Sequence, residues 1–140
     1  MQYKTGDIWD LAKDGWIVVT TNTEVKKNGR AVMGAGIAKE AAIRFPNLPK
    51  DLGNHIQLRG DMLYVKFPVI CFPTKHDWRE SSKLEWIEKG CKELSCLDLD
   101  GPIYLPRLGC GLGGLNWERE VRPVVDSLLE GDRFILVSQP

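Results

Sequence analysis

A chain of 140 residues, 43% hydrophobic and 27% charged, has the size and composition of an ordinary globular domain. Its 19 basic and 19 acidic residues cancel, which excludes the strongly basic surface of a nucleic-acid coat protein but not a small local contact with nucleic acid. The first residues contain no apolar signal region and no run approaches transmembrane length, so we expect a cytoplasmic protein without a membrane segment.

The four cysteines and two histidines form no recognisable metal site. No two cysteines make a C-x-x-C pair and the histidines complete no zinc spacing, so we expect no metal, no cofactor and no disulfide. Cys71 lies in an apolar run and Cys91 in a predicted helix, which favours buried thiols. Cys110 lies in a glycine-rich loop without a neighbouring His or Asp, so packing is a better interpretation than nucleophilic catalysis.

The chain opens with two predicted strands. A short strand over Tyr3–Thr5 runs into Gly6-Asp7, where Asp7 either caps a turn or accepts a hydrogen bond from a ligand amine. Residues 16–21 are apolar and β-branched, as in a strand buried on both faces. That strand ends at Asn22, where a parallel strand would meet a ligand-binding crevice.

The next part combines a loop, a helix and an irregular segment. The polar residues 23–32 predict a mobile loop, and Gly34-Ala-Gly36 then opens an alanine-rich helix over residues 37–45. Two prolines in residues 46–60 favour irregular structure there.

Two further strands are predicted over residues 61–67 and 69–72. Pro68 between them indicates an edge strand or a break in pairing. A charged loop with one tryptophan follows over residues 73–80.

A helix capped by Ser81 or Ser82 then runs to about Leu94 on an apolar stripe. The chain ends with a strand over residues 103–105, a helix over 117–129 and a strand over 133–137. Six strands alternate with three helices, which predicts an α/β sheet with helices on both faces.

The glycine-rich loop lies between the fifth strand and the last helix. Four glycines fall within six positions, at 109, 111, 113 and 114. Such a loop can turn free N–H groups toward a phosphate, although by itself it is also compatible with a flexible connector. A second glycine loop at Met33–Ile37 suggests a diphosphate held from both sides.

These motifs together resemble the macrodomain family, an α/β/α fold that binds ADP-ribose. The resemblance rests on Gly6-Asp7, Asn22, the Met33–Ala38 loop and Leu108–Trp117, and it covers residues 1–140 as a single macrodomain. It implies three α/β/α layers with a mixed, mostly parallel six-stranded sheet. Phe72-Pro-Thr-Lys75 followed by Trp78 resembles the branch of the terminal ADP-ribose protein glycohydrolase and the DarG-type antitoxin macrodomain.

The resemblance also implies roles for individual residues. Asp7 would accept from the adenine amine, with the Ile8 backbone nearby. Lys75 would face the anomeric carbon of the distal ribose as the catalytic lysine of this branch, and Asn22 would reach that ribose. Two groups of residues would enclose the diphosphate, one being Gly34, Gly36 and Ile37 and the other Gly109, Cys110, Gly111, Leu112 and Gly113.

The sequence departs from the branch at two places. Gly113 stands where the protein-deglutamylating members have an Asp, which favours the DNA-directed relatives, and the loop 24–32 is longer than expected of a DarG-type domain. The expected function is a monomeric, lysine-dependent ADP-ribosyl glycohydrolase acting on ADP-ribosylated thymidine in single-stranded DNA or on protein. The alternatives are a non-catalytic ADP-ribose reader and a phosphatase acting on ADP-ribose 1″-phosphate.

Trp78 has two interpretations. It either belongs to a substrate-facing loop, where it can stack on a nucleobase, or it packs in the core as large aromatic side chains usually do.

Overall fold

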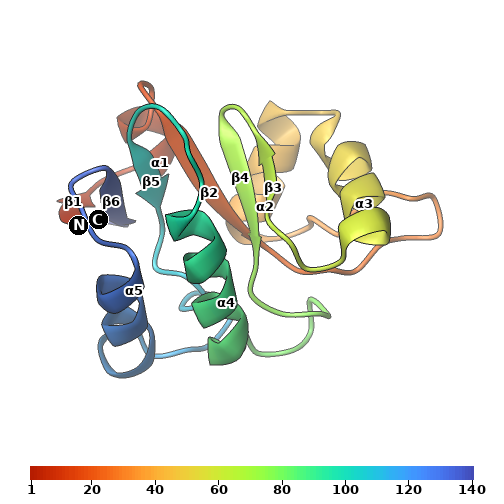
Figure 1. The fold of residues 1–140 in the computed structure, drawn as a ribbon. Coiled ribbons are helices and arrows are strands. Elements are labelled where there is room, and N and C mark those ends of the chain that lie inside the picture. The colour runs from red at the N-terminus through yellow and green to blue at the C-terminus, as the bar shows by residue number, and fades with distance from the viewer.

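The computed structural model describes residues 1–140, which form one six-stranded sheet between helices (Figure 1). The sheet order is β1-β6-β5-β2-β4-β3, and every neighbouring pair is parallel except β3 with β4. The mixed, mostly parallel sheet is therefore confirmed, with β3 as an edge strand. The strands are β1 (Gln2–Thr5), β2 (Trp16–Thr21), β3 (Tyr64–Lys66), β4 (Val69–Pro73), β5 (Ile103–Leu105) and β6 (Phe134–Ser138).

The helices cover both faces of the sheet, which confirms three layers. Alternate residues of β2 face opposite sides: Val18 belongs to the core cluster under α4 and α5, whereas Ile17 and Val19 belong to the cluster under α2 and α3. The helices are α1 (Ile8–Leu11), α2 (Gly36–Arg44), α3 (Leu48–Arg59), α4 (Leu84–Ser95) and α5 (Arg122–Leu128), the last preceded by one π-helical turn, η1 (Trp117–Val121). No helix is both long and apolar enough to traverse a bilayer.

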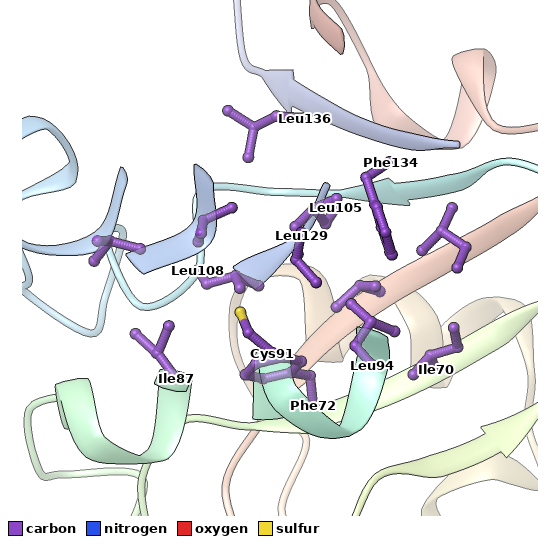
Figure 2. Packing of buried hydrophobic residues seen from close by; sticks show 14 of the residues in the cluster. Ile70, Phe72, Ile87, Cys91, Leu94, Leu105, Leu108, Leu129, Phe134 and Leu136 are labelled. Carbon is purple, nitrogen blue, oxygen red and sulfur yellow. The ribbon is translucent and has the colours of Figure 1, made fainter. Parts of the chain in front are cut away.

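The helix α4 packs closely on the sheet: Figure 2 shows its Cys91 and Leu94 near Phe72 of β4, and Ile87 belongs to the same core cluster. The approach requires a glycine, because a Cβ added to Gly90 would lie 2.3 Å from the Phe72 ring. Burial raises the pKa of the Cys91 thiol to about 12. The same cause raises the pKa of the Cys71 thiol to about 12, and both cysteines are packing residues as predicted.

The prediction of irregular structure over residues 46–60 is wrong, because α3 occupies most of that segment. Pro49 lies in the first turn, where a missing N–H costs no helical hydrogen bond. Leu48 and Leu52 supply the buried stripe. The four-residue helix α1 was also not predicted; it begins at the cap that Asp7 provides.

The segment 23–32, predicted as a loop, forms a small hairpin. Val25 and Ala31 form an isolated β-bridge, and the Ala31 N–H donates to the Pro49 carbonyl of α3 at 2.8 Å. A Cβ on Gly53 of α3 would lie 1.9 Å from the Gly29 carbonyl oxygen, so helix and hairpin are in direct contact. Contacts with residues that are distant in the sequence therefore give this polar segment a defined conformation.

Candidate functional site

The candidate residues gather at one edge of the sheet. Five parallel strands end there, and Asp7, Asn22 and Lys75 each follow such a strand, namely β1, β2 and β4. The loop 109–114 follows β5, and the Gly34–Ile37 turn leads into α2. This edge is where ligands bind in open α/β sheets.

A cavity of about 360 Å³ occupies the β1 end of this edge. Four of the predicted ligand-binding residues line it, namely Asp7, Ile8, Gly36 and Ile37. Sequence analysis missed the other lining residues because they depend on strand order and on helix α1: Gly6, Trp9, Glu40, Pro106, Val137, Gln139 and Pro140. The volume lies in the range of about 300–1,000 Å³ that is typical of small-molecule sites.

The cavity wall contains an unsatisfied polar group. The indole N–H of Trp9 is buried and donates to no acceptor in the chain, although Trp9 lines the cavity. Buried donors in native proteins almost always have a partner, so this one indicates a ligand or an ordered water.

Asp7 caps α1, which agrees with one of its two predicted roles. Its Oδ1 accepts from the Trp9 backbone N–H at 2.8 Å, and the side chain is exposed at the cavity. A carboxylate has two oxygens, so the cap leaves Oδ2 for an amine donor. The two roles are therefore compatible.

Both glycine loops carry backbone N–H groups that have no acceptor within the chain. The consecutive N–H groups of Gly111, Leu112 and Gly113 donate to no acceptor in the chain. The N-terminus of α2 has no capping side chain, so its first N–H groups are also without a partner there. The loops approach each other, because a Cβ on Gly36 would lie 3.8 Å from Leu112 Cδ1. Unpaired donors on two facing loops suit a diphosphate.

The glycine loop is tightly packed on its inner side. Gly109 has φ +71°, in the left-handed region that favours glycine. A Cβ on Gly113 would lie 2.2 Å from Ser82 Oγ and 2.5 Å from the Gly109 carbonyl oxygen. Position 113 therefore has no room for a side chain such as Asp in this arrangement.

Cys110 has the properties of a packing residue. Its thiol donates to the Leu108 carbonyl at 3.3 Å, and burial raises its pKa to about 11. A thiol with this pKa is protonated at neutral pH and is a poor nucleophile. The catalytic interpretation of Cys110 has no support.

Hydrogen bonds on both sides of Lys75 fix the position of its backbone. On one side, the buried Thr74 donates its N–H to the Thr21 carbonyl at 3.0 Å and accepts from the Lys83 N–H at 2.8 Å. On the other, the His76 carbonyl accepts from the Thr23 N–H at 3.0 Å. The half-buried Lys75 side chain forms no ion pair and no hydrogen bond within the chain.

Ser82 connects the lysine loop to the glycine loop. Its hydroxyl donates to Thr74 Oγ1 at 2.9 Å, and its N–H donates to the Gly113 carbonyl at 2.8 Å. The prediction that Ser81 or Ser82 caps α4 is wrong, because α4 begins at Leu84 without a side-chain cap. The sequence showed a polar residue before a helix, but it did not show that this residue forms hydrogen bonds with the distant Thr74 and Gly113.

Asn22 organises the base of the hairpin. Its Nδ2 donates to the Val32 carbonyl at 3.1 Å, and its Oδ1 accepts from the Glu24 N–H at 2.9 Å. The amide carries a second N–H and a second oxygen lone pair beyond these bonds. Asn22 is buried beside Thr23, whose hydroxyl forms a 2.6 Å hydrogen bond with His76 Nδ1, so it lies next to the lysine loop.

Trp78 is 55% exposed, which rules out the core interpretation. The residues around it hold the loop in place: Asp77 accepts from Arg79 Nη2 at 2.7 Å and from Arg79 Nε at 3.0 Å. These hydrogen bonds from Arg79 lower the pKa of the Asp77 carboxyl to about 2. The Arg79 guanidinium lies 5.7 Å from the centre of the Trp78 ring.

No three His, Cys, Asp or Glu side chains come together in a way that could hold a metal ion. A second cavity, of about 260 Å³, lies between the α2–α3 connection and the β3–β4 hairpin and contains none of the candidate residues. The chemistry at the carboxyl-end edge is thus that of backbone N–H groups, the carboxylates of Asp7 and Glu40, the Asn22 amide and Lys75.

Curated relatives align with most of this chain. The DNA ADP-ribosyl glycohydrolase of Thermus aquaticus is 32% identical over 117 residues, which are 74% of this chain and 32% of that protein. The protein of the same name from Mycobacterium tuberculosis is 31% identical over 130 residues, 83% of this chain and 35% of that protein. The chain therefore spans about a third of the length of the curated relatives it matches.

Solved structures share the fold over nearly the whole chain. The macrodomain of Thermus aquaticus DarG matches with a TM-score of 0.78 and 30% identity, over 99% of this chain and 97% of that one. The macrodomain of Mycobacterium tuberculosis DarG matches with a TM-score of 0.79 and 28% identity, over 99% of this chain and 96% of that one. Thermosipho africanus DarTG in complex with ADP-ribose shares the fold, with a TM-score of 0.81 and 23% identity. The match covers 100% of this chain and 42% of that one. No protein-family model matches the chain.

Proposed function

Because this chain belongs to the macrodomain family and is of the DarG type, we propose that it is an ADP-ribosyl glycohydrolase that removes ADP-ribose from modified DNA. The observation that carries the proposal is the position of Lys75. Its loop is hydrogen-bonded both to the segment after β2 and, through Ser82, to the glycine loop. A lysine in a loop that is bonded both to the segment after Asn22 and to a glycine loop with unpaired N–H groups would be able to act on the glycosidic bond of an ADP-ribose bound between them.

The proposed orientation of ADP-ribose follows the distribution of donors and acceptors along the edge. Adenine occupies the cavity, where Asp7 Oδ2 accepts from its amine beside Ile8. The diphosphate lies between the α2 N-terminus and the loop 109–113, because a dianion is stabilised by backbone N–H groups from both sides. The distal ribose then extends toward Asn22 and Lys75.

The crowding at Gly113 supports DNA over a glutamyl ester as the substrate. The lysine–aspartate couple of the protein-deglutamylating branch needs a carboxylate at this position. Here a Cβ would collide with Ser82 Oγ and the Gly109 carbonyl. Lys75 would therefore act without that partner, as in the DNA-directed relatives that the sequence resembles.

Release of products from labelled substrates tests the function. We expect the protein to liberate ADP-ribose from a single-stranded oligonucleotide that carries an ADP-ribosylated thymidine. Release of inorganic phosphate from ADP-ribose 1″-phosphate without this activity would instead assign a phosphatase. Binding of ADP-ribose without either activity would assign a reader, and selective release from a modified protein would replace DNA as the substrate.

Replacing Asp7 by asparagine tests the adenine assignment separately from the cap. Asparagine is as good an N-cap as aspartate, so α1 should keep its N-terminal hydrogen bond. The substitution puts an NH₂ group where the adenine amine needs an acceptor, so we expect ADP-ribose affinity to fall by about 1–3 kcal/mol. Calorimetry measures the loss. Unchanged affinity in a variant that melts normally would remove Asp7 from the adenine site.

A further inference from the structure

A positively charged stretch adjoins the proposed site. Between Glu24 and Glu40 the chain contains no acidic residue but four cations: Lys26, Lys27, Arg30 and Lys39. All four are exposed and none takes part in an ion pair. Because the whole chain has no net charge, this surface is locally positive against a background that is on balance acidic.

The backbone of the hairpin that carries these cationic residues is hydrogen-bonded. The Lys26 N–H donates to the Arg30 carbonyl at 2.8 Å, and the Gly29 N–H donates to the Lys26 carbonyl at 2.9 Å. Asn28 Oδ1 accepts from the Arg30 N–H at 3.0 Å, and Gly29 adopts φ +84° at the turn. Since the hairpin also packs on α3, the three cationic side chains extend from a backbone of defined conformation.

The hairpin and the lysine loop are side by side at the carboxyl-end edge. Figure 1 shows the orange segment after β2 and the green segment after β4 leaving the sheet at the same edge. Three hydrogen bonds between Thr23 and His76 join the base of the hairpin to the residue after Lys75. The positive surface therefore begins next to the proposed point of cleavage.

Trp78 is an exposed aromatic side chain in the same loop as Lys75. It follows Lys75 by three residues, and the paired Asp77 and Arg79 hold the short segment on both sides of it. A tryptophan that is largely exposed offers one face for stacking, and any unpaired base can stack on such a face. A base in a duplex cannot reach it, so the feature favours a single strand.

We propose that the hairpin 25–31 and Trp78 together bind the single-stranded DNA that flanks the modified nucleotide. Lys26, Lys27 and Arg30 neutralise backbone phosphates, and Trp78 stacks on a base adjacent to the modified one. This inference rests on the proposed function and adds the route of the strand across the surface.

Fluorescence anisotropy with an unmodified, labelled single-stranded oligonucleotide tests the contact without any hydrolysis. For the triple variant Lys26→Gln, Lys27→Gln, Arg30→Gln we expect binding at low salt to weaken about tenfold or more. The slope of log affinity against log salt should fall by about 2, since each phosphate contact contributes about 0.7 on a single strand. The matched control replaces Lys13, Lys66 and Lys92, three exposed cations of the opposite edge, by glutamine and should retain binding. Equal losses in both triple variants would overturn the proposal.

Trp78→Ala and Trp78→Phe separate stacking from charge. Alanine should weaken binding of the oligonucleotide about tenfold, whereas phenylalanine keeps an aromatic face and should restore most of the affinity. The salt slope should not change in either variant, because no charge is removed. Full affinity in the alanine variant would remove Trp78 from the strand-binding surface.

Turnover of two substrates separates this inference from the proposed function. The wild type should cleave both a modified thymidine nucleotide and the same nucleotide within a 12-residue oligonucleotide, with higher kcat/KM for the longer one. The hairpin triple variant should lose this preference for length and keep its activity on the nucleotide. If the wild type cleaves neither substrate, the proposed function fails. If the triple variant keeps the preference, or loses activity only on ADP-ribosylated protein, the DNA-binding surface is wrong.

Discussion

Lys75→Ala should bind ADP-ribose with nearly unchanged affinity and lose glycohydrolase activity by several orders of magnitude. The side chain forms no ion pair or hydrogen bond within the chain, so its removal leaves no partner unsatisfied and should not disturb the fold. A residue that contributes mainly in the transition state lowers kcat and kcat/KM together and leaves ground-state binding intact. Single-turnover rates on an ADP-ribosylated thymidine oligonucleotide, together with calorimetry, measure both quantities.

Lys83→Ala is the matched control, since Lys83 lies at the other end of the same loop and pairs only with Glu80, at 3.8 Å. It should retain full activity. Lys75→Arg keeps the charge but cannot become a free amine at neutral pH, so we expect it to be inactive if the lysine is a nucleophile. Activity restored by arginine would assign an electrostatic role instead. An active Lys75→Ala variant would refute the catalytic assignment.

Gly111→Val should abolish measurable ADP-ribose binding while the protein melts at a normal temperature. A Cβ at Gly111 meets no atom within 4 Å, and its φ lies outside the left-handed region, so a side chain costs the fold little. The same open space is where the diphosphate would contact the N–H groups of residues 111–113. Loss of two charge-assisted hydrogen bonds at about 1.5–3 kcal/mol each predicts a decrease in affinity of about 100-fold or more.

Gly113→Ala provides the contrasting variant in the same loop. Its Cβ would lie within 2.5 Å of Ser82 Oγ and the Gly109 carbonyl, so we expect a lower melting temperature as well as weaker binding. If Gly111→Val melts normally and binds ADP-ribose as the wild type does, the loop is a connector and the diphosphate lies elsewhere. Differential scanning calorimetry with and without ADP-ribose distinguishes these cases.

Local sequence patterns predicted the strands and loops whose conformation depends mainly on neighbouring residues. The run of residues 16–21 is apolar on both sides and forms β2, and the glycines at 34–36 and 109–114 form the two loops that flank the site. The alternation of strands and helices indicated a three-layer fold. Placing the candidate residues at the carboxyl-end edge followed from parallel pairing alone, because Asp7, Asn22 and Lys75 each lie within two residues of the end of a strand.

Tertiary structure decided what depends on contacts between distant segments. The helix α3 forms in a proline-containing segment because Pro49 falls in its first turn and Gly53 admits the hairpin backbone at close range. Ser82 resembled a helix cap but instead connects Thr74 to Gly113. Whether Trp78 was buried or exposed, and whether position 113 had room for a carboxylate, depended on distances across the sheet edge that no spacing along the chain encodes.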